Sequence, residues 1–124
     1  MWLANKIRKS GVENTAAVGE VTIGGTSMGV YLSGERRGVT SCMPGGYYWS
    51  PSVGDELLVI KCEDGERMAL GMPSEEYPVQ LEAGEVYICS AGGASIWLKN
   101  NGQVQITGSV NVTGAMKVNG NTIS

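Results

Sequence analysis

The sequence predicts an all-β protein in two parts, a small barrel of short strands followed by a tail of regularly spaced shorter segments. Glycine makes up 19 of the 124 residues, about twice its usual share of roughly 7%. It does not follow the every-third spacing of collagen, and such enrichment is typical of β structure with many turns. The first half alternates apolar runs with turns, and the end of the second half has glycine at every sixth position.

Composition narrows the classes of function. The net charge of -3, from nine basic and twelve acidic residues, argues against a nucleic-acid partner. The chain has no histidine, which excludes a Ser-His-Asp or Cys-His nucleophile and any histidine-ligated metal site. Cys42, Cys62 and Cys89 lack CxxC spacing and are expected to be reduced, buried thiols, with one disulfide as the alternative. We expect no enzyme activity, no cofactor and no metal.

Residues 1–12 are predicted to form an N-terminal arm. Trp2, Leu3 and Ile7 stand beside basic residues in "MWLANKIRKS", a pattern too short for a helix that is stable alone. The arm either packs on its own domain or docks into a neighbouring subunit. Its apolar run is too short for a signal peptide, and no stretch approaches the ~20 apolar residues of a transmembrane helix. We therefore expect synthesis as a soluble protein in the cytoplasm.

Residues 13–73 are predicted to form the barrel. "AAVGEVTIGG" and "SMGVYLS" alternate in polarity, "RRGVTSCMPGG" leads into the turn-rich "YYWSPSVGD", and "ELLVIKC" is an uninterrupted apolar run typical of a buried strand. The tight turn "EDGE" then connects to "RMALGMP". Five strands in about 60 residues, with one long connection, favour an OB-like Greek-key barrel. A fragment of a β-sandwich is the alternative.

Residues 74–80, "SEEYPVQ", are predicted to be a joint, because a proline and two adjacent glutamates mark a change in composition. From residue 81 onward the charged side chains are limited to Glu82, Glu85, Lys99 and Lys117. The tail, residues 81–124, therefore owes its solubility to Asn, Gln, Ser and Thr rather than to charge.

The tail alternates at period two from residue 84 to residue 120. Even positions are apolar or glycine except at Ser90 and Asn100, and odd positions from 99 onward are nearly all polar. Alternation places each set on one face of an extended chain, but this run is far longer than a normal strand of about 5 to 6 residues. Glycines are therefore predicted at corners, where the backbone takes a positive φ without a Cβ penalty: Gly102, Gly108, Gly114 and Gly120.

Each segment between corners has only two inward side chains. Burying one Val or Ile is worth roughly 1.5–3 kcal/mol, whereas fixing each backbone residue costs roughly 1–2 kcal/mol, so a six-residue unit is not stable alone. Other units or other chains must cover its apolar face. Three intertwined copies, as a trimeric β-helix or β-prism, do this most simply and also remove exposed strand edges. The predicted trimer core contains Val86, Ile88, Ile96, Leu98, Val104, Ile106, Val110, Val112, Met116 and Val118.

Two other arrangements have a similar pattern. Antiparallel hairpins with turns at "NNG" and "VNG" would keep the same parity. A left-handed hexapeptide β-helix of the acyltransferase type also has a period of six, but it normally runs over many more coils, and its enzymes rely on a histidine that this chain lacks.

The whole layout resembles phage baseplate assembly protein V and the central spike proteins of contractile tails and related injection systems. The resemblance rests on the tail "GQVQITGSVNVTGAMKVNG", the barrel-like "GDELLVIKCEDGERMALG" and the order of the two parts. It implies an OB-like barrel attached to the tail hub and a trimeric β-helix that points toward the target membrane. Many such spikes end in an apex with a His-x-His iron site. This chain has no histidine, so its tip is simple or another polypeptide caps it.

Tyr47, Tyr48 and Trp49 form an aromatic run in the middle of the barrel segment. They could stack nucleic-acid bases, which requires a basic groove, or pin the loop to its own barrel. The resemblance implies instead a contact with the hub or between subunits, where aromatic residues are enriched. The candidate hub contact therefore combines these three residues with Trp2 and Leu3 of the arm.

Acidic residues in the turn "EDGE" do not indicate a metal site. Glu63, Asp64 and Glu66 lack the Asp-x-Asp-x-Asp-Gly spacing of a 12-residue calcium loop, so a solvated turn is expected.

Two functions follow from these patterns. The first is a homotrimeric structural spike in a virion tail or tail-like particle, with hub and baseplate proteins, a separate tip protein and, transiently, the target cell envelope as partners. The alternative is a monomeric OB-type binding module, for single-stranded nucleic acid or a protein ligand, with a β-hairpin tail.

Overall fold

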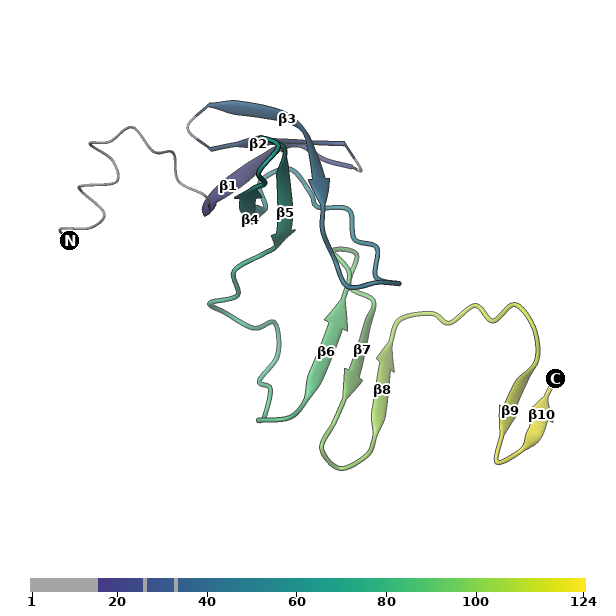
Figure 1. Ribbon diagram of the computed structural model, residues 1–124. Helices are drawn as coiled ribbons and strands as arrows, with labels where there is room; N and C mark the ends of the chain where they lie inside the picture. Colours follow the sequence, from purple (N-terminus) through teal and green to yellow (C-terminus); the bar gives the residue numbers. More distant parts are fainter. Residues whose placement is uncertain (1–15, 26, 33) are drawn as a thin grey trace. The chain divides into compact units, whose positions relative to one another are not determined.

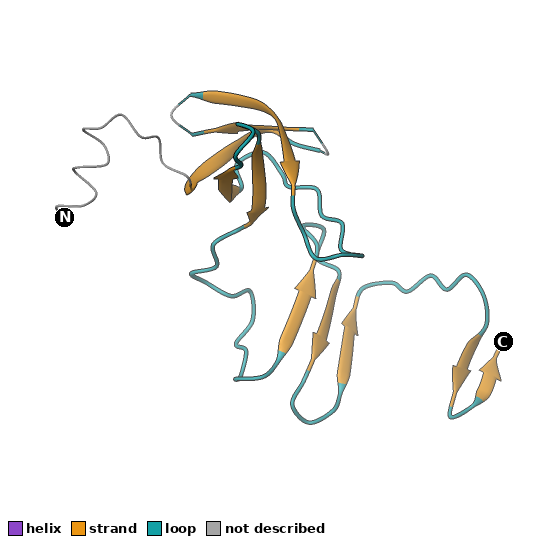
Figure 2. Ribbon diagram, in the orientation of Figure 1, coloured by secondary structure: helices purple, strands orange, loops and turns teal. Residues whose placement is uncertain are grey.

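The computed structural model describes residues 16–25, 27–32 and 34–124, which form ten β-strands (Figures 1 and 2). The predicted N-terminal arm, with Trp2 and Leu3, lies outside the described residues. Within them there is no helix, and so none long and apolar enough to cross a membrane. The chain divides into two compact units between Glu75 and Glu76, inside the segment predicted to be a joint. Each unit is described by itself.

The N-terminal unit is a closed five-stranded barrel. Its strands pair in the order β1-β2-β3-β5-β4, and β4 pairs with β1 to close the barrel. The β3–β5 pair is parallel, whereas the other four pairs are antiparallel. The predicted all-β class with a small barrel is confirmed, and the closed barrel is compatible with the predicted OB-fold. The strands are β1 (Ala16–Ile23), β2 (Met28–Tyr31), β3 (Glu35–Ser41), β4 (Glu56–Lys61) and β5 (Arg67–Gly71).

Alternating side chains of these strands fill the barrel. Leu57 and Val59 of β4 are buried while their neighbours Glu56 and Leu58 are exposed, as expected for one inward and one outward face. Every barrel strand contributes at least one inward residue, and the core consists of Val21, Met28, Val30, Val39, Leu57, Val59 and Ala69. The barrel therefore covers its own apolar side chains.

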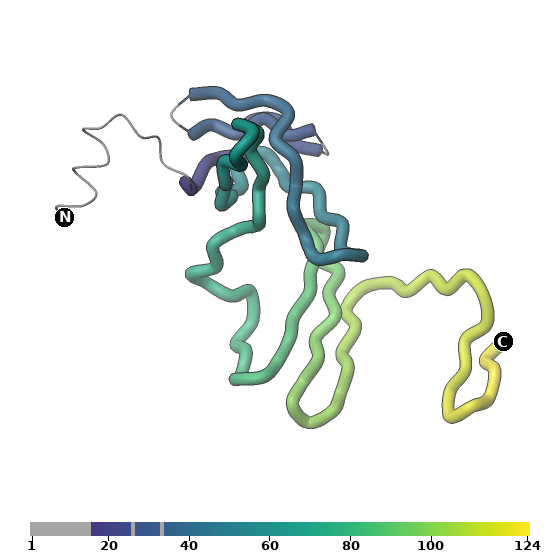
Figure 3. Tube along the Cα trace, in the orientation of Figure 1, coloured from purple at the N-terminus to yellow at the C-terminus, as the bar shows by residue number. Residues whose placement is uncertain are grey.

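The C-terminal unit contains two separate small sheets (Figure 2). Figure 3 shows the path of the chain from one sheet to the other. Strands β6 (Val86–Cys89), β7 (Ser95–Leu98) and β8 (Val104–Thr107) form an antiparallel meander. Strands β9 (Met116–Val118) and β10 (Asn121–Ile123) form a hairpin. Within one chain, the tail thus folds by antiparallel hairpins, one of the arrangements compatible with the sequence, and the intertwined trimeric β-helix stays a prediction.

Three-residue loops explain how the alternation continues through the meander. In the β6–β7 connection, Ser90 N donates to Ala94 O at 3.0 Å, and Gly93 has a φ of 97°. In the β7–β8 connection, Lys99 N donates to Gln103 O at 2.9 Å. Each loop places three residues between the two residues of this last hydrogen bond, and such loops commonly end in a residue with positive φ. An odd loop length keeps even-numbered residues on one face before and after the turn.

The three cysteines are not buried, so this expectation was wrong. Cys42 and Cys89 are exposed, Cys62 is half-buried, and none is in a disulfide. Cys42 follows the last residue of β3, and Cys62 follows the last residue of β4. Cysteine ranks among the most buried residue types, but these positions lie where strands leave the barrel wall, and neither is a core position.

The packing of β1 against β2 requires glycine at position 19. Gly19 is buried in β1, and a Cβ there would lie 2.8 Å from Tyr31 O and in contact with the side chains of Val30 and Leu32. We expect Gly19→Ala to destabilise the barrel by about 1–3 kcal/mol, because the backbone must move to relieve the overlap. Gly45→Ala is the control, since a Cβ at Gly45 would meet no atom within 4 Å. Urea unfolding measures both; equal stability of the two variants would contradict the prediction.

Candidate self-association surface

One face of the meander is entirely apolar. Cross-strand register places Val86 beside Leu98 and Leu98 beside Val104, and it places Ile88 beside Ile96 and Ile96 beside Ile106. Because directly paired residues share a face, these six side chains form two adjacent rows. They keep 41–56% of their surface exposed, and no other strand of the C-terminal unit packs against them. This apolar face, defined by the six residues, is the main candidate site.

The opposite face of the meander is polar and aromatic. Tyr87 and Trp97 are cross-strand partners whose rings meet edge to face, with centroids 5.9 Å apart. Lys99 Nζ lies 4.4 Å from the centroid of the Trp97 ring, a favourable cation–π distance. Gln105 of β8 pairs with Trp97 on its other side. This face has side-chain partners within its own sheet, whereas the apolar face lacks a covering layer.

Apolar residues remain exposed beyond β8. Four side chains of the predicted trimer core lie between residues 110 and 118 and keep 46–62% of their surface exposed: Val110, Val112, Met116 and Val118. Val110 lines a hollow of about 500 Å³ with Ile88, Ile96 and Ile106 at the end of the apolar face. The predicted trimer-core residues therefore include all six of the apolar face and four that continue beyond it.

All four predicted corner glycines have a positive φ: 84° at Gly102, 126° at Gly108, 116° at Gly114 and 81° at Gly120. Their settings differ. Gly102 and Gly120 lie in hairpin turns, Gly108 directly follows β8, and Gly114 lies in the irregular segment before β9. The chain reverses at two of the four positions, and at the other two it bends without regular pairing.

Sequence alternation missed Ile123 as a member of the apolar set. Ile123 pairs with Met116 and Val118 pairs with Asn121 across the β9–β10 hairpin, so Ile123 shares a face with Met116 and Val118. The two-residue turn Asn119-Gly120 shifts the pattern by one position, whereas "VNG" had been expected to keep the parity. That expectation was wrong, because an even loop length exchanges even and odd positions. The Asn-Gly dipeptide, a strong signal for a two-residue hairpin turn, could have revealed it.

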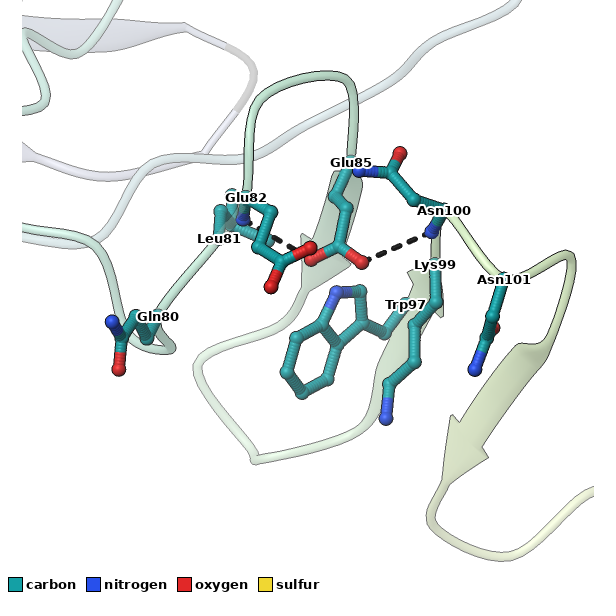
Figure 4. A pocket seen from close by; sticks show the side chains of 8 residues that line it. All are labelled: Gln80, Leu81, Glu82, Glu85, Trp97, Lys99, Asn100 and Asn101. Carbon is teal, nitrogen blue, oxygen red and sulfur yellow. Dashed lines mark hydrogen bonds between the residues drawn. The ribbon is translucent and has the colours of Figure 1, made fainter.

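Glu85 connects the start of the meander to the β7–β8 turn (Figure 4). Its carboxylate accepts hydrogen bonds from Asn100 N at 3.0 Å and from Glu82 N at 3.2 Å, and Asn100 Nδ2 donates to Ala83 O at 2.9 Å. The Asn100 N–H first, and then the Glu82 N–H, lower the pKa of Glu85, because both stabilise the ionised carboxylate. Glu85 thus holds together two segments that are distant in sequence.

A hollow of about 540 Å³ adjoins this contact and is lined by Trp97, Lys99 and the segment before β6 (Figure 4). The indole of Trp97 extends toward the Glu85 carboxylate, although Trp97 Nε1 makes no hydrogen bond of normal geometry within the described chain. The hollow belongs to the polar face, opposite the candidate self-association surface.

The predicted aromatic contact lies in the connection between β3 and β4. Tyr47 is 62% exposed, Tyr48 is 96% exposed and Trp49 is 39% exposed. A turn in which Tyr47 N donates to Pro44 O at 3.0 Å precedes them, and the segment lines a hollow of about 470 Å³. Residues 42–54 carry no charge. These three consecutive aromatic residues are thus exposed on the surface of the barrel unit.

Within the described chain, no group of three or more carboxylates and cysteines is arranged to hold a metal ion. Glu63 and Asp64 lie in the three-residue loop between β4 and β5, where Cys62 N donates to Glu66 O at 2.7 Å and Asp64 Oδ1 accepts from Glu66 N at 3.0 Å. One carboxylate of the acidic turn, that of Asp64, therefore accepts a hydrogen bond from the backbone of the same turn.

No protein-family model matches the chain, and no curated protein is significantly similar to it.

The lowered pKa of Glu85 makes the β6–β8 sheet sensitive to acid. A carboxylate with a lowered folded pKa stabilises the folded state above its unfolded pKa, and this contribution is lost as the pH falls through the folded pKa. We expect the Asn100 amide proton resonance to titrate with a midpoint below the roughly 4.3 of a free glutamate, together with a loss of stability on acidification.

Glu85→Gln should abolish that titration and reduce the loss of stability on acidification. Glu82→Gln is the control, because Glu82 joins this contact through its backbone N–H and C=O groups. This substitution should leave the Asn100 titration in place. An Asn100 resonance that still titrates in the Glu85→Gln variant would show that another group controls it. Amide NMR between about pH 3 and pH 7 covers the relevant range.

Proposed function

We propose that the chain is a structural spike protein, a homotrimer whose tail forms a stiff shaft at the tip of a contractile tail or a related phage-derived injection system. The barrel end attaches to the tail hub, and the shaft transmits the force of sheath contraction toward the target cell envelope. The particle role rests on the resemblance of the sequence to central spike proteins. The observation that carries the trimer is the uncovered apolar face of the meander.

An apolar sheet face of this kind requires a covering layer. Full burial of a Val, Leu or Ile side chain is worth roughly 1.5–3 kcal/mol, and because about half of each is already covered, complete burial adds about 1 kcal/mol each, or on the order of 6 kcal/mol per copy. One association step costs roughly 4–15 kcal/mol. Burial of the apolar face of the meander therefore stabilises the trimer only marginally. In this proposal, burial of the apolar residues at 110–118 supplies the remaining stabilisation.

Charges in the tail favour association through the apolar face. Glu82, Glu85 and Lys99 line the hollow beside Trp97, on the polar face of the meander. Lys117 is on the hairpin face opposite Met116 and Val118. Three copies can thus bring their apolar faces together without burying an unpaired charge, which would be strongly destabilising. The outward side of such a shaft presents polar Asn, Gln, Ser and Thr residues.

Attachment to a hub is assigned to the barrel unit. Tyr47, Tyr48 and Trp49 lie in an uncharged segment, keep exposed side chains and are not part of the barrel core. Aromatic residues of this kind are enriched at protein interfaces. Trp2 and Leu3 of the arm complete the proposed contact on the basis of the sequence.

A monomeric binding module is the second candidate. Hairpin turns within one chain favour it, since the meander forms without partner strands. A monomer would, however, leave the six side chains of the apolar face exposed to water, and the net charge of -3 disfavours nucleic acid as its ligand. Tight, salt-sensitive binding to single-stranded nucleic acid would support this candidate.

Solution mass tests the trimer. Light scattering should give three times the 13.0 kDa of the single chain for the full-length protein, and a monomer or weak oligomer for a chain truncated after Pro78. Loss of the tail removes the apolar face while leaving the closed barrel. A full-length monomer would refute the spike proposal, and a stable dimer would instead indicate that two meanders cover one another face to face.

Neighbouring residues of β8 provide a matched pair of substitutions. Ile106→Asp places a charge on the apolar face and should abolish the trimer, because like charges from three copies would be buried near one axis. Gln105→Asp places the same charge on the opposite face and should leave the trimer intact. Val112→Asp extends the test to the segment after β8. Sedimentation or light scattering reads out all three, and an Ile106→Asp trimer would show that the assigned face is not the interface.

A further inference from the structure

The β9–β10 hairpin reverses the chain by a turn unlike those of the meander. Asn119 and Gly120 both have a positive φ, 52° and 81°, which is the signature of a two-residue type I′ turn. Asn119 is the one non-glycine position with positive φ among the described residues, and Asn tolerates this conformation well. The turn therefore places β10 antiparallel to β9. The six-residue spacing of glycines consequently ends at Gly120, where the chain reverses direction.

One face of this hairpin is apolar except for Asn121, and no other strand of the C-terminal unit packs against it. Met116, Val118 and Ile123 share a face and keep 46–51% of their surface exposed. Outside the hairpin, no strand of the C-terminal unit lies within 8 Å of it, Cα to Cα. An isolated two-stranded hairpin is at best marginally stable in water, and three-residue strands provide few ladder hydrogen bonds. No strand of the C-terminal unit outside the hairpin provides the covering layer that would stabilise it.

A second copy of the same hairpin can cover this face. The hairpin face holds no charge, because Lys117 pairs with Thr122 on the other side, so identical faces can meet without repulsion. Asn121 is the polar member of the face and lies next to the turn, at the hairpin tip. Met116 and Val118 also belong to the same even-numbered set as the apolar face of the meander.

We propose that the three hairpins of the trimer meet at its axis through Met116, Val118 and Ile123 and so close the end of the shaft. This inference rests on the proposed trimer. It adds the identity of the covering partner, which is the same segment of each copy, and it gives the shaft a self-closed end. A separate tip protein is then not required to cover these side chains.

Cysteine cross-linking tests whether identical positions meet. In a background in which Cys42, Cys62 and Cys89 are replaced by serine, Ile123→Cys is oxidised under mild conditions and analysed on a non-reducing gel. Three equivalent thiols near one axis should give a covalent dimer with the third chain unlinked, because a disulfide needs Cβ atoms about 3.5–4.5 Å apart. Thr122→Cys, on the opposite face of the same strand, is the matched control and should remain unlinked.

Light scattering of each variant before oxidation separates the two proposals. A trimer in which Ile123→Cys cross-links and Thr122→Cys does not supports the closed end. Met116→Cys is a second variant on the apolar face of the hairpin. If the protein is a trimer but neither Ile123→Cys nor Met116→Cys cross-links more than Thr122→Cys, the closed end is refuted and the trimer proposal stands. A monomeric background refutes the trimer and the closed end together.

Discussion

The C-terminal unit depends on one constraint: a sheet that is apolar on one face needs a layer over that face. A sheet of five strands can curve until its two edge strands, β1 and β4, pair with each other. The barrel then closes around its own core, in which Leu57 and Met28 are fully buried. Three strands of four residues cannot curve far enough to close. The same alternation of apolar and polar residues therefore produces a self-sufficient unit in one half of the chain and an incomplete one in the other.

Turn length links local geometry to this constraint. Three-residue loops keep even-numbered residues on one face through the whole meander, and the two-residue turn at Asn119 and Gly120 exchanges the faces once. A single residue more or less in any of these loops would move part of the apolar set to the polar face. The composition of the apolar face thus depends as much on the loops as on the strands.

Much of this organisation could be predicted from the sequence. Alternation identified the six residues of the apolar face, because a period of two assigns faces without any knowledge of strand pairing. It could not identify Ile123, whose face depends on the turn type, or the role of Glu85, whose two backbone donors are brought together by the β7–β8 turn. Cysteine exposure was likewise inaccessible, since residue type predicts average burial and not position at a strand end.

By itself, the sequence determined the all-β class, the small barrel, the change in composition near residue 75 and the side chains that face together in the tail. These properties follow from local periodicity and glycine spacing, which each segment carries independently of its neighbours. Tertiary structure alone decided that β4 closes the barrel on β1, that residues 86–107 reverse in hairpins, and that Glu85 contacts Asn100. The physical reason is that alternation specifies which face a side chain occupies, whereas strand pairing and turn geometry specify what that face meets.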